Sequence, residues 1–79
     1  METIACEVLT IENDEDVTVG HINVYSIPRM GEYLWFSERL RGNSSWQVEE
    51  VCHWIGNGKL GSYPHGYQHC AIYVKPTTN

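Results

Sequence analysis

Hydrophobic and polar residues alternate along most of this chain with the period of two that is typical of β-strands. In residues 3–11 the side chains on one side are Ile4, Cys6 and Val8, and those on the other are Ala5, Glu7 and Leu9. Four further stretches have the same character, namely residues 17–25, 33–37, 46–55 and 67–74. Nothing in the chain keeps a helical period for two full turns. The pattern therefore predicts five short strands.

Turn-forming residues separate these stretches. They lie in the polar segment 12–16, in 27–31 with its proline and glycine, in the polar loop 38–45 and in the glycine-rich loop 56–66. Gly20 inside the second strand predicts a bulge or a bend. Short strands joined by turns are typical of an all-β barrel or small sandwich, and closing the sheet removes exposed strand edges. We predict a compact barrel of about five antiparallel strands.

The last two strands are expected to form a hairpin. In residues 67–74, alternation points Cys70, Ile72 and Val74 inward and Tyr67, His69, Ala71 and Tyr73 outward. In the third strand, either Trp35 or Phe36 is expected to fill the core.

The fourth strand has two possible phasings. Strict alternation puts Trp46, Val48, Cys52 and Trp54 inside, together with the carboxylate of Glu50. A bulge at Glu49-Glu50 instead turns Val48, Val51 and Ile55 inward and leaves Cys52 and Trp54 outside. We favour the bulge because it keeps a carboxylate out of the core.

A longer pattern has a known counterpart. Residues 27–32 (Ile-Pro-Arg-Met-Gly-Glu) precede a short strand, then a Val-x-x-Val-Cys-His-Trp strand and a terminal Ile-Tyr-Val-Lys-Pro strand. Over about residues 22–76 this resembles small, mostly uncharacterised SH3-like barrel proteins carried by phages, plasmids and integron cassettes. The resemblance implies an SH3-like fold and a mobile-element origin, and it attaches no activity.

Length and charge restrict the function. The chain has 79 residues and a net charge of −5, with six of its ten acids in the first sixteen residues. We expect one domain over residues 1–79, with 75–79 as a frayed tail. The scattered cations make nucleic-acid binding unfavourable, whereas a basic protein partner is compatible with the charge. No apolar stretch is long enough to cross a membrane, and the N-terminus does not have the pattern of a signal peptide. The missing signal-peptide pattern and the odd number of cysteines together favour reduced thiols and a cytoplasmic location.

Candidate chemistry is sparse. His53, His65 and His69 are weak metal candidates, because three ligands lack a clear fourth and neighbouring strand residues point to opposite faces. A nucleophilic cysteine needs an accessible pocket and a nearby histidine, and Cys70 is expected in the core. We therefore assign no catalytic residue, no metal and no cofactor.

Aromatic residues are the strongest indication of a contact surface, since exposed aromatics flanked by polar groups are typical of interfaces. The candidate binding residues are Trp46, Trp54, Tyr63, His65, Tyr67 and Tyr73. The leading hypothesis is a non-enzymatic adaptor or modulator that binds another protein. The alternatives are a small-ligand binder or enzyme with its site at a homodimer seam near His69 and Tyr67, and a structural metal-binding domain.

Overall fold

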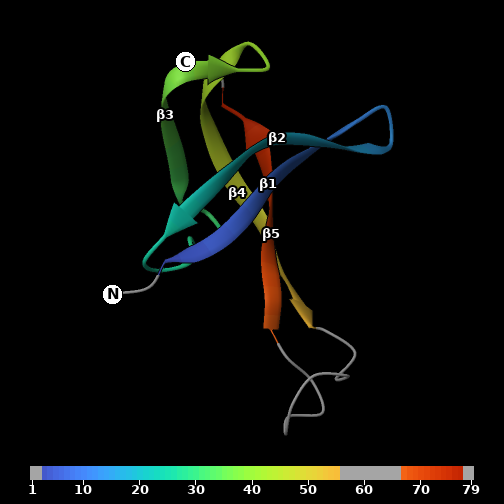
Figure 1. Ribbon diagram of the computed structural model, residues 1–79. Coiled ribbons are helices and arrows are strands. Elements are labelled where there is room, and N and C mark those ends of the chain that lie inside the picture. Colours follow the sequence, from blue (N-terminus) through green and yellow to red (C-terminus); the bar gives the residue numbers. More distant parts are fainter. Residues whose placement is uncertain (1–2, 56–66, 78–79) are drawn as a thin grey trace, which may run out of the picture.

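Five strands form one curled sheet in the computed structural model, which describes residues 3–55 and 67–77 (Figure 1). The strands are β1 (Ile4–Glu12), β2 (Glu15–Val24), β3 (Tyr33–Leu40), β4 (Asn43–Ile55) and β5 (Tyr67–Pro76). Their order in the sheet is β2-β1-β5-β4-β3. The all-β prediction is confirmed, and the sheet is a half-barrel consistent with a small SH3-like barrel.

The pairing differs from the prediction in one respect. Three strand pairs are antiparallel, but β1 and β5 run parallel, with Cys6 opposite Cys70 and Leu9 opposite Tyr73. Hydrophobic alternation is the same in either direction, so the sequence pattern could not distinguish them. In Figure 1 the β1–β2 hairpin crosses the upper part of β4 and β5, so the sheet is curled.

Two tight turns set the register of the hairpins. Asn13 and Asp14 connect β1 to β2 with positive φ angles of 52° and 64°, and Arg41 and Gly42 connect β3 to β4 with 50° and 84°. Two consecutive positive φ angles are what a type I′ hairpin turn requires, and Asn, Asp and Gly adopt them most readily. The polar turn predicted at 12–16 is confirmed. The loop predicted at 38–45 is wrong, because both strands continue to the Arg41-Gly42 turn.

The segment that carries the family resemblance forms a third tight turn. The Glu32 amide donates to the Arg29 carbonyl at 3.1 Å, and Gly31 has a φ of 89°. A glycine with positive φ at the third position is characteristic of a type II turn. The Glu32 side chain accepts a hydrogen bond from the Arg29 amide, which holds the turn from its other side. The turn ends against β4, where Gly31 and Glu32 exchange backbone hydrogen bonds with Val48.

Bulges appear in both places where the sequence predicted them. In β2 the pairing with β1 shifts between Thr18 and Gly20, so Val19 is an extra residue. In β4 the pairing with β5 shifts between Val48 and Glu50, so Glu49 is an extra residue. The bulged phasing of β4 is therefore confirmed.

The core lies inside the curl and draws on all five strands. Its buried members are Cys6, Val8, Val19, Trp46, Val48, Cys70, Ile72 and Val74. Phe36 packs against this cluster from β3, whereas Trp35 is 67% exposed, which settles the choice between them. Val51 packs inward as expected, but the prediction for Ile55 is wrong, since its side chain is 53% exposed.

Side chains bridge the two edge strands, which are not neighbours in the sheet. Leu40 on β3 reaches Gly20 on β2 so closely that a β-carbon at Gly20 would lie 3.4 Å from Leu40 Cδ1. Nearby, the Arg41 guanidinium donates to both carboxylate oxygens of Glu12, at 3.0 and 2.6 Å. This hydrogen bonding lowers the pKa of Glu12 and raises that of Arg41. These contacts link the two sides of the half-barrel through side chains.

The end of the chain is better ordered than predicted. Lys75 and Pro76 belong to β5, and Thr77 donates backbone and side-chain hydrogen bonds to the Ser45 carbonyl at 3.1 and 3.2 Å. The Thr77 hydroxyl also bonds the Ser45 hydroxyl, which is buried. The expectation of a frayed tail over 75–79 is therefore wrong for residues 75–77.

Trp46 gives a test of the core. Its side chain is 2% exposed and its indole N–H donates to the Asn43 carbonyl at 3.2 Å. Trp46→Ala should lower the free energy of unfolding by about 3–5 kcal/mol, which is close to the whole stability of a domain this small. The variant should therefore be largely unfolded even without urea, as a urea titration followed by circular dichroism would show. Trp35→Ala is the matched control and should change the free energy of unfolding by less than about 0.5 kcal/mol. A Trp46→Ala variant with the wild-type urea midpoint would contradict this assignment of the core.

Candidate functional site

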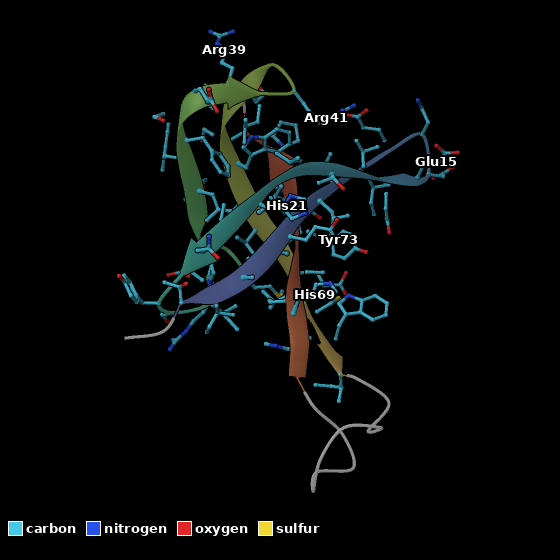
Figure 2. All side chains as sticks on the ribbon, viewed as in Figure 1. Glu15, His21, Arg39, Arg41, His69 and Tyr73 are labelled. Atoms are coloured by element: carbon cyan, nitrogen blue, oxygen red, sulfur yellow. The ribbon has the colours of Figure 1, made fainter. Side chains whose placement is uncertain are left out.

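The sheet presents a second face, directed away from the core, which we call the outer face. Strand pairing places the following residues on it: Ala5, Glu7 and Leu9 from β1; Asp16, Thr18, His21 and Asn23 from β2; Glu50, Cys52 and Trp54 from β4; and His69, Ala71 and Tyr73 from β5. Figure 2 shows His21, Tyr73 and His69 together on this side, over β1, β2 and β5.

Trp54 and His69 form an aromatic pair at one end of the outer face. They are direct partners across the β4–β5 hairpin, and their rings stack with centroids 6.0 Å apart and planes 15° apart. Trp54 is nevertheless 53% exposed, and Ile55 beside it is exposed to the same extent. Both are large apolar groups left in water, and the indole lies nearly parallel to the His69 ring. An exposed tryptophan is the type of side chain that dominates interface energies.

A hollow adjoins this pair on its β1–β2 side. Its volume is about 320 Å³, and it is lined by Ala5, Cys6, Glu7, His21, Ile22, Asn23 and His69. The small side chain of Ala5 leaves the space between longer neighbours. His69 therefore takes part in both the aromatic pair and the hollow.

Glu7 is the acidic group of the hollow, and its neighbours on β2 hold it in place. The Thr18 hydroxyl donates to Glu7 Oε2 at 3.2 Å, and His21 Nε2 lies 4.0 Å from the same oxygen. Glu7 is partly buried, with 31% of its side chain exposed, whereas His21 is 74% exposed. The Thr18 hydrogen bond thus orients the carboxylate, and the imidazole beside it is mostly exposed.

Carboxylates also surround Tyr73 in the middle of the outer face. The Tyr73 hydroxyl donates to Asp16 Oδ2 at 3.0 Å, and this hydrogen bond raises the pKa of Tyr73. Burial, followed by the negative charge of Glu50, raises the pKa of the Cys52 thiol. Both shifts disfavour a further negative charge, as expected for a face with an excess of carboxylates.

The predicted binding residues are only partly brought together. Trp54 and Tyr73 lie on the outer face, but Trp46 is wrong as a candidate binding residue, because its side chain is buried in the core. Tyr67 pairs with Ile55 at the start of β5. Tyr63 and His65, together with the loop 56–66, lie outside the described residues.

The predicted metal ligands do not converge. His53 pairs with the inward-facing Cys70 and His69 with the outward-facing Trp54, so the two histidines lie on opposite faces of the sheet. Within residues 3–55 and 67–77, no group of three or more His, Cys, Asp and Glu residues is arranged to hold a metal ion. The same part of the chain contains no helix long and apolar enough to cross a membrane.

Comparisons with known proteins gave no relative. No protein-family model matches the chain. No curated protein and no solved structure matches it either. The function must therefore be argued from the geometry of the outer face.

Sequence reasoning missed the β1–β2 part of the site, although part of the signal was present. A two-residue turn at Asn13-Asp14 alone would pair Glu7 with Gly20. The bulge at Val19 shifts the register by one residue and places His21 opposite Glu7. The sequence predicts the bulge from Gly20, so the Glu7–His21 pair could have been found. The pairing of β1 with β5, which brings His69 to the site, could not have been found from the sequence pattern.

The three cysteines offer a test of which side of the sheet each occupies. Cys6 and Cys70 are buried in the core, whereas Cys52 lies on the outer face and is only half-buried. Burial and the adjacent Cys70 raise the pKa of Cys6 to about 11, which keeps that thiol protonated and unreactive. At mildly alkaline pH, a thiol reagent should modify Cys52 alone in the folded chain and all three thiols in denaturant. Cys52→Ser should abolish the native reaction, and rapid modification of Cys6 or Cys70 in the folded chain would contradict the assignment.

Proposed function

We propose that this protein is a non-enzymatic protein-binding module and that the outer face around Trp54 is its contact surface. The observation that carries the proposal is the aromatic pair, because Trp54 stays half-exposed while it stacks on His69. Leaving these groups in water forgoes hydrophobic stabilisation, on the order of 1.5–3 kcal/mol for a large side chain. A partner that covers these groups recovers this hydrophobic stabilisation.

The polar surroundings of this aromatic pair support a specific interface. On the same face, the Glu50–Tyr73 pair lies four residues along the hairpin from Trp54 and His69, and Glu7 is opposite Ala71, two residues from His69. An apolar anchor with a polar rim is the usual anatomy of a non-obligate interface. This arrangement favours a partner that binds and dissociates.

The seam hypothesis, in which two copies of the chain form a ligand or catalytic site near His69, has weaker support. Apposing two outer faces would bring Glu7, Asp16 and Glu50 of one copy toward the same residues of the other, and like charges across an interface are unfavourable. A different protein avoids this repulsion.

The setting of the function is also a proposal. All three cysteines are free and two lie in the core, which suits a reducing compartment such as the cytoplasm. The turn at Arg29–Glu32 lies in the segment whose sequence resembles small SH3-like proteins of mobile elements, and the half-barrel sheet is consistent with a small SH3-like barrel. We therefore propose a cytoplasmic modulator with that origin.

Trp54→Ala tests the contact surface. Proteins retained from a lysate by the immobilised wild-type chain should bind the variant on the order of 30-fold more weakly, as for a buried interface tryptophan. Trp35→Ala removes an even more exposed tryptophan from β3 and should retain the same proteins. Equal urea midpoints for the three chains would show that folding is not responsible. If Trp54→Ala and the wild-type chain retain the same proteins with the same affinity, the proposed contact surface is wrong.

A further inference from the structure

We infer that the hollow beside the Trp54–His69 pair receives an arginine side chain of the partner. This inference rests on the proposed function and specifies the chemistry of the residue that docks there. It is argued from the lining of the hollow, the charge of the face around it and the fixed position of Glu7.

The lining of the hollow matches a guanidinium group. Glu7 supplies a carboxylate, Asn23 an amide oxygen and His69 an aromatic ring, all around the small side chain of Ala5. A guanidinium is planar, donates two parallel hydrogen bonds to a carboxylate and stacks on aromatic rings. The volume of about 320 Å³ can accommodate one long side chain. A lysine could form an ion pair with the Glu7 carboxylate, but its ammonium group would not stack on the His69 ring as a planar guanidinium does.

The charge around the hollow also favours a cation. Asp16 and Glu50 lie on the same face as the hollow. Lys75 lies two residues after Tyr73 on β5, farther from the hollow. Arg41 is paired with Glu12, and Figure 2 shows Arg39 and Arg41 in the upper part of the view, above His21 and His69. Glu7 is the one acidic residue that lines the hollow, and with Asp16 and Glu50 further along the sheet the described outer face carries more carboxylates than cations, which disfavours an anionic side chain.

Glu7 is positioned to receive a second donor. Both of its described contacts, from Thr18 and from His21, involve Oε2. A carboxylate has about four lone-pair sites, so it retains the capacity to accept hydrogen bonds from a guanidinium. The Thr18 hydrogen bond reduces the entropy lost when the carboxylate is engaged, since Glu7 is already held in one orientation. His21 is mostly exposed and can swing aside.

A pair of short peptides provides the probe. The ¹⁵N-labelled chain is titrated with acetyl-Gly-Ser-Arg-Ser-Gly-amide, and separately with the same peptide carrying citrulline, which keeps the shape of arginine without its charge. The arginine peptide should give saturable amide shifts at Ala5, Glu7, His21 and His69, with a dissociation constant on the order of 1 mM. The citrulline peptide should bind about tenfold more weakly, because a charge-assisted hydrogen bond is lost.

Two variants assign the effect to Glu7. Glu7→Gln should weaken arginine-peptide binding about tenfold, and His21→Lys should do the same by placing a permanent cation beside the carboxylate. Glu15→Gln is the matched control. It removes the same charge from the exposed end of the β1–β2 hairpin and should leave binding unchanged within about twofold. Dispersed amide spectra establish that each variant is folded.

The inference is overturned if the arginine and citrulline peptides bind equally well. It is also overturned if the shifts lie away from the hollow, or if Glu7→Gln and Glu15→Gln behave alike. Failure here while Trp54→Ala still loses partners would leave the proposed function standing. Arginine binding with no loss of partners in Trp54→Ala would overturn the proposed function and retain the arginine site.

Discussion

The extra residue at Glu49 determines which side chains of β4 face the core. Before it, Val48 pairs with Val74 and points inward; after it, Glu50 pairs with Tyr73 and points outward. Without the bulge, the same strand would turn Glu50, Cys52 and Trp54 toward the core and displace Val51 from it. Burying the Glu50 carboxylate without a partner would be costly, on the order of several kcal/mol. This one-residue insertion therefore separates an apolar core from an outer face that carries Trp54 and the carboxylates.

The curl of the sheet depends on a second constraint, the parallel pairing of β1 with β5. It joins the N-terminal hairpin to the C-terminal three strands and buries Cys6 against Cys70. Leu40 against Gly20 then bridges the two edge strands, and Arg41 in the β3–β4 turn pairs with Glu12 at the end of β1. On the outer face the same pairing makes Glu7 and Ala71 neighbours. The hollow thus combines a carboxylate from one end of the sequence with an imidazole from the other.

The sequence predicted the local features well. The five strands, the 12–16 turn, the bulge near Gly20 and the bulge at Glu49 each follow from residues close together in the chain, such as a glycine in a strand or two adjacent glutamates in an apolar run. Trp46 was misplaced for a different reason. Its burial depends on β3, which covers it through Leu34, and on Pro76, its partner on β5.

The candidate site was only partly predictable, because it too depends on contacts between segments that are distant in the sequence. Trp54 and Tyr73 could be placed on one face from the phase of a single hairpin. To predict that Glu7 lies opposite His21, the bulge must be included in the register of β1 with β2. To predict that His69 lies near them, the pairing of β1 with β5 must be known. Contacts between distant segments leave no periodic signal in a single sequence, so the hollow became visible only in three dimensions.

Cross-strand nuclear Overhauser effects test the phase of β4 most directly. The bulge predicts backbone contacts between Glu50 and Tyr73 and between Val51 and Ile72. An unbulged strand would instead bring Glu49 opposite Tyr73 and Glu50 opposite Ile72. Observation of the first set would support the division into core and outer face. The second set would contradict it, and with it the exposure of Trp54.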